Sequence, residues 1–102
     1  MEKRVIILDL TDCKYFMELN ERIRVAFDFP EGFGTSVHAF WDLLWSDCDA
    51  DEVVIKGMNT MPKPLIDYMH RMCWALDKKV EEREQDSKIY SYINPFSYRI
   101  ED

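Results

Sequence analysis

The feature that most constrains the fold is a pair of short apolar runs set between longer segments with helical spacing. The first run is Val5–Leu8 and the second is Val53–Ile55, and both are rich in β-branched residues. Continuous apolar runs of this length are typical of strands buried on both faces, as in a parallel sheet covered by helices. The sequence predicts strands near residues 4–9, 52–57 and 88–94.

Three segments between these runs repeat apolar side chains every three or four residues, as one face of a helix requires. We expect helices near residues 12–27, 36–46 and 64–84. Thr11 or Asp12 is a candidate cap for the first helix, and Lys78–Asp86 forms a highly charged, mostly solvated end of the last. Strands separated by helices pair in parallel through right-handed crossovers. The predicted fold is an α/β domain, a three-stranded parallel sheet packed with helices.

The chain end, residues 94–102, is expected to be an extension of this single domain of residues 1–102. Ile89–Ile93 and Phe96–Ile100 both alternate with period two, which is compatible with a hairpin. However, Asn94-Pro95 is not a favoured two-residue hairpin loop. A tail that crosses the sheet without pairing therefore stays open as the alternative to an extra strand.

The charge of the chain restricts its partners. Twenty acidic residues against 13 basic ones give a net charge of −7. This disfavours direct binding of nucleic acid, because phosphate backbones require a basic surface. It fits a basic protein partner, since opposite charges accelerate encounter. The first residues lack a signal-peptide pattern and no run is long enough to cross a bilayer, so we expect a cytoplasmic protein without membrane contact.

The sequence offers little for catalysis or metal binding. Cys13, Cys48 and Cys73 are scattered without CxxC spacing, which is typical of reduced thiols in the cytosol. His70 and Cys73 lie one turn apart and could ligate a metal with Cys48, but a cysteine on an apolar stripe is commonly a small buried hydrophobe. Gly-rich phosphate loops, nucleophile elbows and Walker patterns are absent from the sequence. We predict no enzymatic activity, no small-molecule substrate, no cofactor and no metal.

The segment Phe29–Trp45 concentrates the unusual residues, with two of the three glycines and two of the three tryptophans. A loop leads into Thr35-Ser36, either of which can cap a helix. His38 and Asp42 lie one turn apart beside the apolar face of that helix, next to Trp41 and Trp45. On spacing alone, this is an amphipathic core helix with a solvated aspartate. A catalytic His38–Asp42 pair is disfavoured, because a helix N-terminus favours neutral histidine.

The same segment resembles the signature of the barstar family. Pro30-Glu31, Phe33-Gly34 and Ala39-Phe40-Trp41-Asp42 match the family pattern in order and without a gap, and weaker resemblance extends to about Ile93. Members of this family are small cytoplasmic α/β inhibitors that plug the active site of a secreted ribonuclease. The resemblance implies the same topology. It also implies that Asp42 presents a carboxylate where the phosphate of the substrate would sit.

Several positions depart from the family pattern. His38 stands in place of an aspartate, Gly32 in place of a loop aromatic, Phe33 in place of tyrosine and Ser36 in place of asparagine. Asp42 persists while its neighbours change, which indicates an immunity protein for a different nuclease toxin. The resemblance implies that this toxin is a ribonuclease. The competing interpretation is an acidic interaction module or homodimer that uses the edge of Phe33 and Trp45. The expected partner-binding residues are Phe33, Gly34, Thr35, His38, Trp41, Asp42, Trp45, and Glu81 and Glu82 as rim charges.

Overall fold

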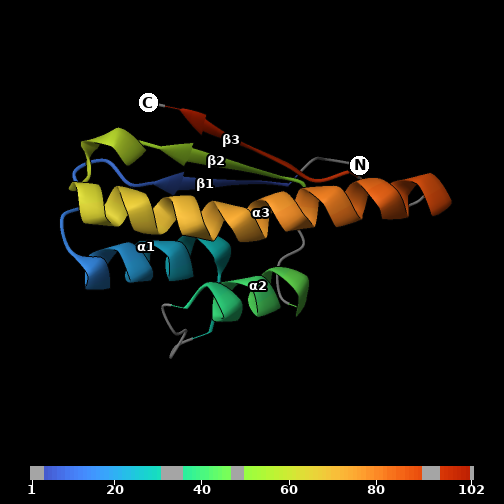
Figure 1. Cartoon of the computed structure of the whole chain (residues 1–102), viewed down its shortest axis with the longest axis horizontal. Coiled ribbons are helices and arrows are strands. Elements are labelled where there is room, and N and C mark those ends of the chain that lie inside the picture. The colour runs from blue at the N-terminus through green and yellow to red at the C-terminus, as the bar shows by residue number, and fades with distance from the viewer. Residues whose placement is uncertain (1–3, 31–35, 47–49, 91–94, 102) are drawn as a thin grey trace.

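Three parallel strands form a sheet of order β1-β2-β3 in the computed structural model, with helices along one side (Figure 1). The structure describes residues 4–30, 36–46, 50–90 and 95–101, except the side chains of Val37, Trp45 and Ser46. The elements in chain order are β1 (Val5–Asp9), α1 (Phe16–Phe27), α2 (Val37–Ser46), β2 (Glu52–Lys56), the short 3₁₀ helix η1 (Met58–Thr60), α3 (Lys63–Ile89) and β3 (Ser97–Glu101). The predicted α/β fold with a three-stranded parallel sheet is confirmed.

The core lies between the inner face of the sheet and the three helices. Ile6 and Leu8 of β1 pair in register with Val53 and Ile55 of β2, and all four side chains are buried. A cluster of three phenylalanines joins α1 to α2. The ring of Phe27 stacks on that of Phe29 at 5.3 Å and meets that of Phe40 edge-on at 5.3 Å. This packing fixes which side of α2 faces the solvent.

Burial on both faces was predicted for both apolar runs and holds only for β2. Val53, Val54 and Ile55 are all buried, whereas Val5 and Ile7 of β1 are 44% and 55% exposed. The reason is position in the sheet. β2 has a neighbouring strand on each side, whereas β1 is an edge strand, and its outer face is exposed.

The third strand lies later in the chain than predicted. α3 continues through Ile89, so the expected strand near 88–94 is wrong at its described residues, and residues 91–94 lie outside the described part. The helix is extended by residues with high helix propensity, and Lys88 Nζ lies 3.9 Å from Glu84 Oε1 one turn earlier. Ser97–Glu101 takes the place of the third strand and pairs in parallel with β2. The pairing of β3 excludes a C-terminal tail that crosses the sheet without pairing. The hairpin of Ile89–Ile93 with Phe96–Ile100 is also wrong, because Ile89 is helical.

The helix starts also differ in part from expectation. α1 begins at Phe16, and its N-cap residue Tyr15 makes no side-chain cap. Asp12 instead has a φ of 60° and donates its backbone N–H to the Thr60 hydroxyl at 2.8 Å, so it belongs to a turn against η1. The expected cap of α2 is present, because Ser36 Oγ accepts a hydrogen bond from the Ala39 N–H at 3.0 Å. No helix within the described ranges is long and apolar enough to span a membrane.

Candidate partner-binding face on α2 and α3

The outward side of α2 carries the two polar residues that the sequence singles out. Phe40 and Leu44 are buried in the core and fix the rotation of the helix. His38 and Asp42 are consequently both exposed, one turn apart on the solvent side. The Ser36 cap fixes the start of the same helix. The fold therefore presents the Asp42 carboxylate on a short, well-packed helix.

An aromatic pair extends this surface from α2 onto α3. The half-buried ring of Trp41 lies 6.0 Å from the ring of Trp74, measured between centroids. Trp74 is 46% exposed, which is a large apolar area to leave in water. Sequence analysis missed this residue. Its signal was a tryptophan next to Cys73 but outside the apolar stripe of α3, where a core role does not explain it.

A buried lysine attaches the end of α2 to α3. Lys79 is 1% exposed, and its Nζ donates a hydrogen bond to the Leu44 carbonyl at 2.7 Å. That carbonyl lies in the last turn of α2, where carbonyls lack helical partners and the helix dipole favours a cation. Lys79 Nζ also lies 5.1 Å from the centre of the Phe96 ring, just before β3. The prediction that Lys78–Asp86 forms a mostly solvated helix end is thus wrong at Lys79.

The remaining predicted site residues divide into described and undescribed ones. Phe33, Gly34 and Thr35 lie outside the described residues, as does the side chain of Trp45 within α2. Glu81 is exposed and Glu82 half-buried, and both belong to α3. Glu81 follows Trp74 by seven residues, which places it on the same side of the helix about 10 Å further along. The structure thus brings His38, Trp41 and Asp42 together on α2, beside the helix that carries both glutamates.

The cysteines and histidines within the described residues show no arrangement for chemistry. Cys13 and Cys73 are buried, His70 is exposed, and Cys48 lies outside the described residues. Burial, with Asp77 nearby, raises the pKa of the Cys73 thiol to about 11, so the reactive thiolate is disfavoured at neutral pH. Within the described residues, no group of three His, Cys, Asp or Glu side chains could hold a metal ion.

Comparison with known protein families identifies the family of this chain. Residues 3–93 match the family model described as Barstar, the barnase inhibitor. The chain belongs to the Barstar family. This family consists of inhibitors and not of enzymes, and the resemblance seen in Phe29–Trp45 is confirmed. The match ends before β3, so the strand that completes the sheet lies beyond the matched residues. No curated protein and no solved structure matched the chain.

Proposed function

We propose that this protein inhibits a nuclease toxin by covering its active site with the outward side of α2, and that it acts as an immunity protein without catalytic activity. The observation that carries this proposal is the exposed Asp42 carboxylate beside the Trp41–Trp74 pair, in an inhibitor family. A nuclease active site is basic because it binds phosphate. Arginine binds a carboxylate and a phosphate through the same two parallel N–H bonds, so a carboxylate can take the place of the phosphate.

The aromatic pair supports the same use of the surface. Tryptophan is enriched among the interface residues that contribute most binding energy, and such residues lie near the centre of an interface. Trp41 and Trp74 provide an apolar area next to the charged anchor, and contact with a partner would remove that area from water. A charged centre enclosed by aromatic contacts is protected from solvent, which strengthens its pairing with a cation.

Selectivity for a particular nuclease is assigned to the residues around Asp42. His38 stands one turn before it, where the family pattern has an aspartate, and both side chains are exposed. An imidazole in that place accepts fewer cationic neighbours than a carboxylate does. Histidine in place of aspartate at position 38 therefore weakens binding to the ribonuclease that other family members inhibit, more than it weakens the contact made by Asp42. The exposed Glu81 and the net charge of −7 on the whole chain attract a basic nuclease during encounter.

The test is inhibition of a nuclease domain encoded beside this gene. We expect the purified protein to abolish cleavage at one molecule per nuclease and to co-elute with it in gel filtration. If cleavage is unchanged and this protein elutes as a self-associated species, the result would instead support the acidic homodimer. Cleavage of RNA or DNA by the purified protein itself would contradict the non-catalytic part of the proposal.

A further inference from the structure

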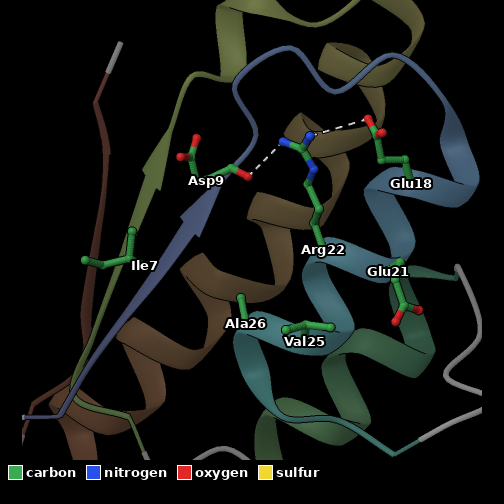
Figure 2. A pocket seen from close by; sticks show the side chains of 7 residues that line it. All are labelled: Ile7, Asp9, Glu18, Glu21, Arg22, Val25 and Ala26. Atoms are coloured by element: carbon green, nitrogen blue, oxygen red, sulfur yellow. Dashed lines mark hydrogen bonds and ion pairs between the residues drawn. The ribbon is translucent and has the colours of Figure 1, made fainter.

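A second surface of the protein lies between the open edge of β1 and α1. It is a groove of about 450 Å³ (Figure 2). The strand contributes Ile7 and Asp9, and the helix contributes Glu18, Glu21, Arg22, Val25 and Ala26. None of these residues belongs to the candidate face on α2 and α3. The groove therefore needs an explanation of its own.

One wall of the groove is the backbone of an edge strand. Glu52 donates its N–H to the Arg4 carbonyl, and Leu10 donates its N–H to the Lys56 carbonyl, so the even-numbered residues turn toward β2. Because these groups alternate along a strand, Val5, Ile7 and Asp9 turn their N–H and C=O groups toward the open edge. Figure 2 shows the Asp9 carbonyl directed at Arg22 of α1, whereas the side chains of Ile7 and Asp9 point away from α1. An exposed strand edge of this kind is a template for pairing with another chain.

Arg22 closes one end of that edge and leaves the other end open. Its Nη1 donates to the carbonyls of Asp9 at 3.1 Å and Thr11 at 2.9 Å. These contacts protect the strand edge beyond Ile7, which is a common device against unwanted pairing. Val5–Ile7 lies before the protected end. The facing helix adds an apolar wall there, with Val25 62% exposed and Ala26 half-buried.

The rim of the groove is acidic. Asp9, Glu18 and Glu21 contribute three carboxylates. Arg22 pairs with Glu18 and Arg24 pairs with Glu21, so the Asp9 carboxylate gives the rim its excess negative charge. Hydrogen bonds from Thr11 hold the pKa of Asp9 below its usual value, and a hydrogen bond from Arg24 does the same for the pKa of Glu21. Both groups are therefore ionised at neutral pH. Since the whole chain carries −7, the rim reinforces the field of the molecule.

We propose that this groove docks an extended segment of a basic partner, which adds a strand to β1 at Val5–Ile7. Its apolar side chains would contact Val25 and Ala26, and its alternate lysines or arginines would point to the other face of the sheet, on the side of the Asp9 carboxylate. Main-chain hydrogen bonds provide affinity in this mode, and the alternate side chains provide selectivity. A second copy of this chain is the disfavoured occupant, because pairing would bring two sets of the same carboxylates together.

The probe is a capped heptapeptide of alternating valine and lysine, added to the purified protein while backbone amide signals are followed by NMR. We expect shifts at Val5, Ile7, Asp9 and Val25. The matched control peptide has alternate backbone amides N-methylated. It keeps its charge but loses the N–H donors along one edge, so it should bind at least about tenfold more weakly. Equal binding of the two peptides, or shifts at α2 instead, would overturn strand addition.

Two arginine substitutions on α1 provide the second arm. Val25→Arg introduces bulk and a like charge into the groove and should weaken peptide binding at least about tenfold. Met17→Arg is the matched control, because Met17 is 85% exposed on the same helix and does not line the groove. Both variants should keep the parent circular dichroism. Equal affinity of the Val25→Arg variant and the parent, or sedimentation as a dimer paired through β1, would refute the proposal.

Discussion

The face on α2 and the groove at β1 differ in what they offer a partner. The α2 face presents side chains, Asp42 with the Trp41–Trp74 pair, on helices fixed by a buried core. The groove presents the backbone of Val5–Ile7 beside an acidic rim. Side-chain recognition depends on a few atoms, whereas strand addition depends on main-chain groups that nearly every residue has. The two surfaces should therefore respond to different substitutions.

The two edges of the sheet differ in the residues that they carry. At β3, Arg99 Nη1 lies 2.6 Å from Glu52 Oε1 and Arg99 Nε lies 3.2 Å from Glu101 Oε1, so the outer face carries bound charges. At β1, the outward positions Val5 and Ile7 are apolar, and protection by Arg22 begins at Asp9. Charged edge strands resist pairing, whereas apolar ones favour it.

The largest expected effect separates the surfaces directly. Asp42→Ala should cost at least about 2–4 kcal/mol of nuclease binding, because the cations of the nuclease would be left desolvated and unpaired. The same variant should bind the valine–lysine peptide as the parent does. Glu101→Ala is the control, since Glu101 belongs to β3, which lies away from α2 (Figure 1). Calorimetric titration measures both, and a parent-like Asp42→Ala affinity for the nuclease would contradict the assignment.

The next effect tests whether Lys79 fixes α2. Lys79→Met removes the donor to the Leu44 carbonyl and should lower the free energy of unfolding by about 1–3 kcal/mol. Hydrogen exchange should accelerate in α2 more than in β1, so the first surface loosens and the second does not. The adjacent Lys78→Met is a matched control, because Lys78 is exposed and lies 3.9 Å from Glu81 Oε2. Equal exchange in the two variants would show that the buried ammonium does not position the helix.

These predictions depend on features that the sequence reveals unequally. The parallel sheet, the cap at Ser36 and the exposed pair His38 and Asp42 follow from periodicity and short-range chemistry, and they could be predicted. Sequence cannot distinguish an edge strand from a central one, so the exposure of β1 could not be foreseen. The burial of Lys79 depends on a carbonyl 35 positions away in α2, which no local pattern encodes.

The third strand shows how two local signals can compete. The alternation in Ile89–Ile93 indicates a strand, but the charged residues before it have high helix propensity and extend α3 through Ile89. The alternation in Phe96–Ile100 is also compatible with a strand, in a segment that the sequence predicts to be a C-terminal extension. Only tertiary pairing with β2 selects Ser97–Glu101.

The contact between α3 and β3 belongs to neither surface and should be sensitive to alkaline pH. The Cys73 thiol has an ordinary pKa of 9.0 and a folded pKa of about 11, so the unfolded chain loses this proton first. Stability is therefore complete below pH 9.0 and decreases as the pH rises toward about 11, by on the order of 1–2 kcal/mol. Urea unfolding across this range measures the decrease. Cys73→Ala should flatten it, and a parallel decrease in that variant would assign the effect to other groups such as Tyr98.

The smallest expected effect concerns encounter and not affinity. Glu81→Gln should slow association with the nuclease by about two- to fivefold at low salt and leave dissociation nearly unchanged, since exposed charges act mainly on the on-rate. Stopped-flow measurements at several salt concentrations test this, with Glu101→Gln on β3 as the remote control. A change confined to the dissociation rate would place Glu81 inside the contact instead of at its rim.

Competition at the nuclease active site tests the central claim most directly. The measurement titrates the complex with a non-cleavable oligonucleotide that occupies the phosphate site of the nuclease. If Asp42 takes the place of the phosphate, the two ligands exclude each other, and the apparent Kd of this protein rises in proportion to the oligonucleotide concentration. A ternary complex, with that Kd unchanged at saturating oligonucleotide, would contradict the account.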